Sequence, residues 1–113
     1  MNANDFKKMR STYIEETFEL SDTKRIEYTE GHHNENVLWN FENIGKRLAI
    51  SPMKVLSVYL QKHTSSVFNY IKDGKEYSES IEGRISDIIN YLILLLCMIR
   101  TYKKKGIQND PEC

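Results

Sequence analysis

The chain has few of the residues that interrupt or cross-link a polypeptide. Among 113 residues there are two cysteines, two prolines and five glycines. Cys97 stands in an apolar run and Cys113 in a polar segment, so we expect one buried thiol and no disulfide between the two. There is no Cys-x-x-Cys pair and no cysteine–histidine spacing, which excludes the common zinc sites. Strand-like alternation is also hard to find, and this favours helices.

An excess of charge of one sign is missing as well. The 16 basic and 16 acidic side chains give a formal net charge of zero, which argues against duplex nucleic acid as a partner. The apolar run over Ile88–Ile99 is only 12 residues long and is interrupted by Asn90 and Tyr91, too short to cross a bilayer. The first residues lack the apolar segment of a signal peptide. We therefore expect a cytoplasmic protein without a membrane partner.

The spacing of the apolar residues predicts four or five helices. In the first, they recur at three- and four-residue steps: Phe6, Met9, Tyr13, Ile14 and Phe18. We expect an amphipathic helix that buries this face and ends near Ser21 or continues to Tyr28. A loop over residues 31–36 and a short helix over residues 37–48 follow.

Two long helices complete the predicted fold. Ser51 followed by Pro52 is a strong start signal, since serine caps a helix and proline suits its first position. Gly74 can close that helix in the left-handed conformation. The last helix is predicted to begin near Ser78, with Glu79 in its first turn, and to end in lysines before Gly106.

The last helix is apolar on every side over Leu92–Ile99. Since few other helices exist to cover it, we expect part of this surface to pack against another copy of the chain. The sequence therefore predicts an all-α bundle of four to five helices with two long C-terminal helices, as a homodimer or homotetramer. Residues 1–106 would form one domain and residues 107–113 a flexible tail.

Two segments carry a resemblance to known proteins: NFENIGKRLAISPMKVLSVYLQKHTSSVFNYIKDG and SESIEGRISDIINYLILL. Over residues 25–100 the chain resembles small phage and prophage proteins similar to the nucleotide modification-associated helical domain. That domain is itself similar to the MazG and dimeric dUTPase-type pyrophosphohydrolases. The resemblance implies an oligomeric helical bundle with a nucleotide pocket between long helices. In those enzymes, a Glu-x-x-Glu pair and acids on a second helix hold magnesium.

The acidic residues of this chain match that enzyme pattern incompletely. Glu16 and Glu19 have the Glu-x-x-Glu spacing, although they also suit a solvated helix face. Asp87 fits the last acid of the pattern, but Gly83 stands four residues before it, where an acid is expected. Glu82 is about 140° away from Asp87 around the helix. We therefore expect no catalytic residues, no metal site and no cofactor, unless these four acids form a magnesium site.

Two polar stripes are better candidates for binding a nucleotide. The first, on the last helix, has i, i+3, i+7 spacing and consists of Arg84, Asp87 and Tyr91. The second, on the helix that starts at Pro52, consists of Tyr59, Lys62, Ser66, Asn69 and Tyr70. Cations suit phosphates, tyrosine rings stack on bases, and amides or carboxylates read base edges. The alternative is a surface ion pair beside tyrosines that border the core.

Four further residues bear on the site. Trp39 is off the apolar stripe of its helix, which predicts an exposed stacking platform or an oligomer contact. The resemblance implies that Arg25 and Tyr28 close the pocket. His63 lies on the apolar side of its helix, and we interpret it as a half-buried, hydrogen-bonded histidine rather than a general base.

Three functional hypotheses follow. The first is a non-catalytic nucleotide-binding protein, in its most concrete form a phage-type sponge that sequesters a signalling nucleotide such as a cyclic dinucleotide. The second is a magnesium-dependent, MazG-like nucleoside triphosphate pyrophosphohydrolase that uses Glu16, Glu19, Glu82 and Asp87. The third is a helical interaction protein without a small ligand.

Overall fold

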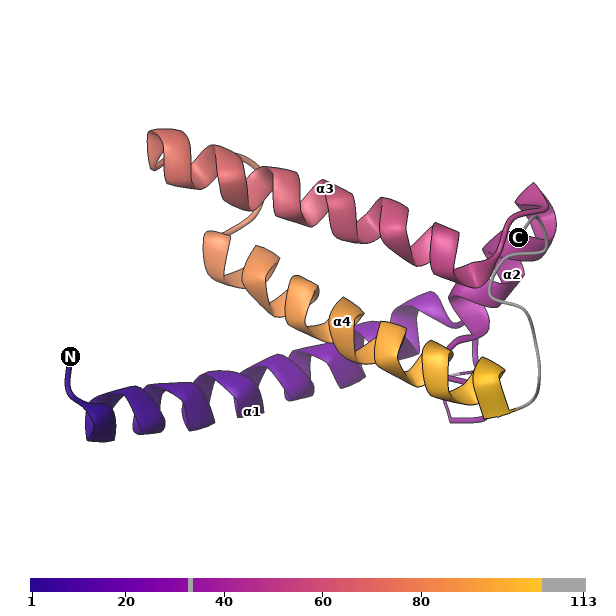
Figure 1. Ribbon diagram of the computed structural model, residues 1–113, viewed down its shortest axis with the longest axis horizontal. Coiled ribbons are helices and arrows are strands. Elements are labelled where there is room, and N and C mark those ends of the chain that lie inside the picture. Colours follow the sequence, from indigo (N-terminus) through magenta and orange to yellow (C-terminus); the bar gives the residue numbers. More distant parts are fainter. Residues whose placement is uncertain (33, 105–113) are drawn as a thin grey trace.

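The computed structural model describes residues 1–32 and 34–104 of the chain. Within these residues there are four helices and no β-strand, which confirms the predicted all-helical class. The helices are α1 (Ala3–Tyr28), α2 (Trp39–Leu48), α3 (Pro52–Asp73) and α4 (Ile81–Lys104) (Figure 1). The predicted helix end at Gly106, the predicted tail and Cys113 lie outside the described residues.

Helix α4 is the element that packs against both long neighbours. It runs antiparallel to α3, while α1 lies along another side of α4 (Figure 1). The short α2 packs on α3 at the end of the molecule where α1 stops and α3 begins. The N-terminal turns of α1 extend past the start of α4.

The ends of α3 are set by local sequence. The Ser51 side chain accepts a hydrogen bond from the Lys54 amide, Pro52 occupies the first turn, and Gly74 closes the helix at φ 69°. Helix α4, in contrast, begins at Ile81, later than predicted. The reason is a second serine: Ser80 Oγ accepts from the Gly83 amide at 3.0 Å. The residues just before Ser80 therefore belong to the turn between α3 and α4.

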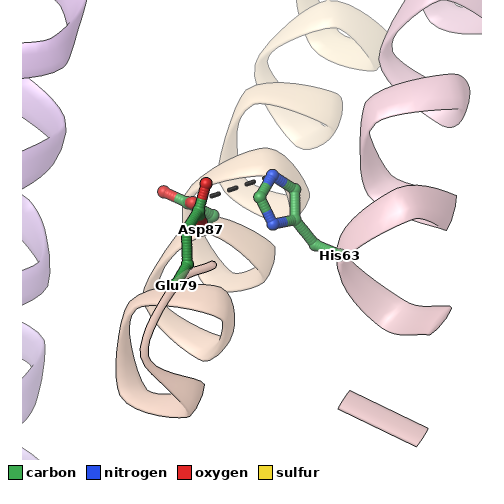
Figure 2. A group of neighbouring side chains, drawn as sticks. All are labelled: His63, Glu79 and Asp87. Atoms are coloured by element: carbon green, nitrogen blue, oxygen red, sulfur yellow. Dashed lines mark ion pairs between the residues drawn. The ribbon is translucent and has the colours of Figure 1, made fainter. Parts of the chain in front are cut away.

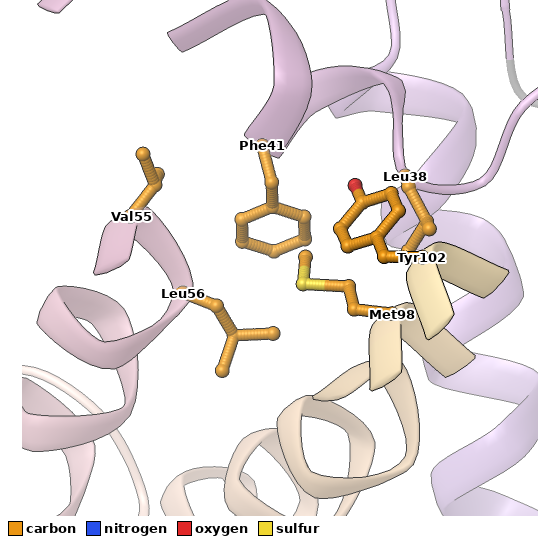
Figure 3. Packing of buried hydrophobic residues seen from close by; sticks show 6 residues of the cluster. All are labelled: Leu38, Phe41, Val55, Leu56, Met98 and Tyr102. Carbon is orange, nitrogen blue, oxygen red and sulfur yellow. The ribbon is translucent and has the colours of Figure 1, made fainter. Parts of the chain in front are cut away.

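The apolar core lies between α2, α3 and α4 (Figure 3). It consists of six buried residues: Leu38, Phe41, Val55, Leu56, Met98 and Tyr102. The Tyr102 hydroxyl donates to Glu42 Oε2 at 2.7 Å, so its buried polar end is satisfied. Among the described residues of α1, none belongs to this core.

Helix α1 packs against α4 through Tyr13 and polar side chains, so the predicted burial of its apolar side was wrong in part: Tyr13 and Ile14 are half-buried, but the other three residues of that side are exposed. Phe6, Met9 and Phe18 are 50%, 57% and 45% exposed, whereas Thr17 is 2% exposed. Apolar periodicity marks an apolar face but does not say which face meets a neighbour. Here the neighbouring side of α4 is polar and requires hydrogen-bonding partners.

The centre of the α1–α4 contact is a cluster of hydroxyl groups. The Tyr13 hydroxyl donates to the carbonyl oxygen of Glu82 and lies 2.7 Å from Ser86 Oγ. Thr17 Oγ1 lies 3.0 Å from the same Ser86 oxygen. Since both Thr17 and Ser86 are buried, these contacts satisfy groups that would otherwise be costly to remove from water.

Much of the apolar surface of α4 remains uncovered. Leu92, Leu96 and Ile99 are 50%, 46% and 38% exposed, and Cys97 is exposed, which corrects the expectation of a buried thiol. Although the apolar run was judged too short to cross a bilayer, the whole helix meets the length and composition of a membrane span. Core helices of soluble proteins meet the same criterion when they are mostly buried, whereas 22% of the apolar window of α4 is buried within the chain.

Candidate functional site

A cavity of about 570 Å³ lies between α1, α3 and α4, with the start of α2 at one end. Its volume is within the range of small-molecule binding sites, roughly 300–1,000 Å³. Six of the eleven predicted ligand-binding residues line it: Arg25, Tyr28, Tyr59, Lys62, Asp87 and Tyr91. The structure thus brings residues from three helices to one place.

Four other predicted residues line a second, smaller cavity of about 90 Å³ near the end of α3: Ser66, Asn69, Tyr70 and Arg84. Glu79, in the turn before α4, lines both cavities. The polar stripe predicted on α3 therefore runs along one helix, but its residues line two different cavities.

Trp39 lines neither of these two cavities. It is half-buried and stacks on His32, with ring centroids 4.7 Å apart and an interplanar angle of 15°. The expectation of an exposed tryptophan was therefore wrong, because the His32 ring covers one face of the indole.

One wall of the large cavity is aromatic. Tyr59 and Tyr91 are stacked with centroids 6.1 Å apart, and Phe41 meets both rings edge-on. Burial, followed by the nearby Asp87 charge, raises the pKa of Tyr91 to about 12. Its hydroxyl is therefore neutral at physiological pH and keeps a proton that it can donate.

The opposite side of the cavity carries charges from α1. Lys24 Nζ lies 2.6 Å from Asp87 Oδ1, and Arg25 Nη1 lies 2.9 Å from Asp22 Oδ1.

Lys62, on α3, has no acidic partner within 4.0 Å in the part of the chain that the structure describes. Its exposed ammonium is therefore available to an anionic ligand.

In the wall of the large cavity, three side chains form a compact cluster: His63, Glu79 and Asp87 (Figure 2). A nitrogen of His63 and one oxygen each of Glu79 and Asp87 lie within 4.8 Å of one another. His63 Nε2 is 3.7 Å from Asp87 Oδ2. On the other side, Arg84 Nη1 lies 3.4 Å from His63 Nδ1, and Arg84 Nε lies 3.6 Å from Glu79 Oε2.

The protonation of His63 follows from its neighbours. Burial, more than any other cause, lowers the pKa of His63 below its usual 6.5, against the opposing charge of Asp87. The ring is therefore neutral at pH 7. A guanidinium group only donates, so Nδ1 accepts from Arg84 and the proton resides on Nε2, facing Asp87.

This cluster fits a divalent metal ion poorly. A metal-bound histidine usually donates its second N–H to an acceptor, whereas the second nitrogen of His63 meets the donor Arg84. The ammonium of Lys24 already occupies one oxygen of Asp87 at 2.6 Å. The two cations balance the two carboxylates, and the arrangement is that of a hydrogen-bonded charge network.

The four acids of the enzyme hypothesis do not converge. Glu16 and Glu19 are exposed on α1, and the side chain of Glu82 is exposed on α4. Asp87 instead pairs with Lys24. Within residues 1–32 and 34–104, the acids near enough to share a metal are those clustered with His63.

Sequence reasoning missed several residues of the site. On α1, the polar positions Thr17, Ser21 and Lys24 follow a four- and three-residue step, and this stripe was the available signal. Ser21 Oγ donates to Asn90 Oδ1 at 2.5 Å, beside the pair formed by Lys24. Glu79 had no such signal, because its place depends on the turn before α4.

The chain matches no protein-family model, no curated protein and no solved structure.

Proposed function

We propose that the chain is a non-catalytic nucleotide-binding protein and that the large cavity is its binding site. The observation that carries the proposal is the pairing of the stacked Tyr59 and Tyr91 rings with Lys62 at one cavity. A base fits against an aromatic wall, and a phosphate fits an ammonium group without an acidic partner. Arg25 and Tyr28, from α1, border the ligand on the opposite side.

The separation of Glu16, Glu19 and Glu82 from Asp87 supports binding without hydrolysis. Pyrophosphohydrolysis of the expected type needs several carboxylates around magnesium, and here Asp87 is held by Lys24 while Glu16 and Glu19 face solvent. We therefore place the magnesium-dependent enzyme second to the binder. A helical interaction protein without a small ligand is the third possibility.

The resemblance to small phage and prophage proteins suggests the biological form of this binding. We propose a sponge that acts in the host cytoplasm as a homodimer or homotetramer and sequesters a signalling nucleotide, for example a cyclic dinucleotide. The oligomer would form through Leu92–Ile99, where apolar side chains of α4 are exposed.

A thermal-shift screen against nucleoside triphosphates and cyclic dinucleotides, with and without magnesium, tests the proposal. A ligand that binds the folded state raises the melting temperature by mass action. We expect stabilisation by a nucleotide in the presence of EDTA and recovery of that nucleotide unchanged. Stabilisation only with magnesium, accompanied by pyrophosphate release, would favour the enzyme. If no nucleotide changes the melting temperature, the remaining hypothesis is a helical interaction protein without a small ligand.

Two lysines of α3 offer a matched control for the site. Lys62 lines the cavity, whereas Lys72 is exposed in the last turn of the same helix and lines neither cavity. Lys62→Ala should weaken nucleotide binding about tenfold, the effect of one charge-assisted hydrogen bond. Lys72→Ala should leave the affinity unchanged. Equal effects of the two substitutions would place the ligand elsewhere.

A further inference from the structure

One face of α4 has the residue spacing of a helix–helix interface. Five apolar residues follow steps of four, three, four and three along this helix: Ile85, Ile89, Leu92, Leu96 and Ile99. This is the alternation of a and d positions in a heptad repeat, the pattern by which two helices pack along their length. We name these five residues the heptad face. Ile89 is half-buried, and the other four are 38–50% exposed.

The heptad face is turned away from the neighbours that α4 has within its own chain. Around α4, Asn90 contacts α1 and Met98 belongs to the core. At about 100° per residue, the centre of the heptad face lies on the opposite side of the helix from the midpoint between these two residues. Asp87 and Tyr91, which line the cavity, also lie on the far side of α4 from this face. A partner on the heptad face would therefore contact neither α1 nor the cavity wall through these residues.

The chain has the surface to accommodate a partner. It exposes 8305 Å², whereas a compact monomer of 13.3 kDa exposes about 6,500 Å². Its Cα radius of gyration is 16.0 Å, compared with about 13 Å for a compact domain of this length. A standard dimer interface covers about 800 Å² on each partner, well within this excess.

Charges at the two ends of the heptad face indicate how a partner helix would be oriented. Glu82 lies one turn before Ile85, and Lys103 lies one turn after Ile99; both are exposed. Two parallel copies would place Glu82 beside Glu82 and Lys103 beside Lys103. Two antiparallel copies would place each glutamate beside a lysine, and such flanking charges set orientation in helix pairs.

We infer that a second copy of the chain covers the heptad face and that the two α4 helices pack antiparallel. This inference sharpens the homo-oligomer included in the proposed function, and it does not depend on nucleotide binding. Because the heptad face and the cavity lie on different sides of α4, oligomerisation and binding can fail separately.

Sedimentation equilibrium of the full chain tests the interface. The wild type should be a dimer, and Leu92→Glu with Leu96→Glu should raise the dimer dissociation constant more than about 100-fold. The matched control is Phe68→Glu with Ile71→Glu on α3, two side chains 69% and 72% exposed that lie outside the heptad face. This control should remain dimeric. Circular dichroism checks that each variant keeps its helices.

Three outcomes would overturn the interface: a monomeric wild type, an undiminished dimer in the Leu92/Leu96 variant, or equal loss in the control. Partition of the wild type into phosphatidylcholine–phosphatidylglycerol vesicles in place of dimerisation would also overturn it and assign the face to a lipid surface. The Leu92/Leu96 variant should keep any nucleotide-induced thermal shift. Loss of that shift in a variant that keeps its helices would contradict the separation of the heptad face from the cavity and would count against the proposed binding site.

Cysteine cross-linking tests the antiparallel orientation. In a background with Cys97→Ser and Cys113→Ser, Glu82→Cys together with Lys103→Cys should form a dimer under mild oxidation. These positions are about 30 Å apart within one helix, so the link must join two chains. If the two α4 helices are antiparallel, each single variant should stay uncross-linked, because the two copies of its cysteine then lie at opposite ends of the helix pair. Efficient cross-linking of either single variant would show a parallel pair and overturn the orientation.

Discussion

Helix α4 is held on its two sides by contacts of different chemistry. Towards α2 and α3 it contributes Met98 and Tyr102 to an apolar core, whereas towards α1 it presents Ser86, Asp87 and Asn90 to polar partners. Burying a large apolar side chain is worth about 1.5–3 kcal/mol, and a typical hydrogen bond has a net value of about 0.5–1.5 kcal/mol. The polar contact fixes the position of α1 but holds it less strongly than the core holds α3.

This difference matters because the cavity lies on the border between the two regions. One wall, with Tyr59 and Tyr91, is built on the core, and the other wall, with Lys24 and Arg25, belongs to α1. Elements with few buried apolar contacts open at low free-energy cost. We therefore expect α1 to separate from the aromatic wall more readily than α3 does.

The strongest contrast is expected at the centre of the core. Leu56 is 1% exposed, and Leu56→Ala should lower the free energy of unfolding by about 2–5 kcal/mol, since it removes buried methyl groups and leaves a cavity. Val58→Ala, on the same helix but 65% exposed, should change it by less than about 0.5 kcal/mol. Urea unfolding measures both. Similar values for the two variants would remove the distinction between core and surface on α3.

The ion pair of the polar contact comes next. Asp87→Ala removes the partner of Lys24 and should cost about 1–3 kcal/mol, because the Asp87 side chain is only 13% exposed. Asp22→Ala breaks the exposed pair with Arg25 and should cost less than about 1 kcal/mol. Urea unfolding of both variants gives the comparison. A larger effect for Asp22 would contradict the assignment of Asp87 as the buried anchor of α1.

The hydroxyl cluster should contribute less. Ser86→Ala removes the hydrogen-bonding partner of Thr17 and one partner of Tyr13, and we expect a loss of about 1–2 kcal/mol. Ser57→Ala removes only an exposed contact with the Lys54 carbonyl and should be close to neutral. Thermal unfolding resolves this difference. If Ser86→Ala is also neutral, α1 does not depend on the cluster.

The smallest expected effect is a dependence on pH through His63. Because its pKa is lowered in the folded state, the unfolded chain binds a proton more readily, and stability falls as pH drops below 6.5 towards the folded pKa. His63→Gln should flatten this part of the stability profile. The neighbouring charges of Lys24, Glu79, Arg84 and Asp87 remain in the variant, so they serve as an internal control. A wild-type profile that is flat between pH 7 and 5 would contradict a buried neutral histidine.

What the sequence predicts well is local. The cap at Ser51 and the left-handed Gly74 depend on neighbouring residues alone, and both lie where their residue types indicate. The start of α4 was placed early because Ser78 and Ser80 carry the same signal. Local preference does not decide between two adjacent caps.

What the sequence does not predict is the choice of contact faces. The apolar stripe of α1 suggested burial of Phe6 and Met9, yet α4 presents Ser86 and Asn90 on the side that meets α1. Matching two faces requires the positions of both helices, which one-dimensional periodicity does not give. For the same reason, the sequence did not show that the polar stripe predicted on α3 divides between two cavities.

Hydrogen–deuterium exchange with and without a nucleotide identified in the thermal-shift screen tests the central claim most directly. Without ligand, amides of α1 should exchange faster than those of α3 around Leu56, because α1 is attached by polar contacts. With ligand, we predict slower exchange in residues 18–28 of α1, the part of this helix that contributes side chains to the cavity. Protection confined to the heptad face of α4, or equal protection throughout the chain, would contradict a nucleotide site between α1 and α3.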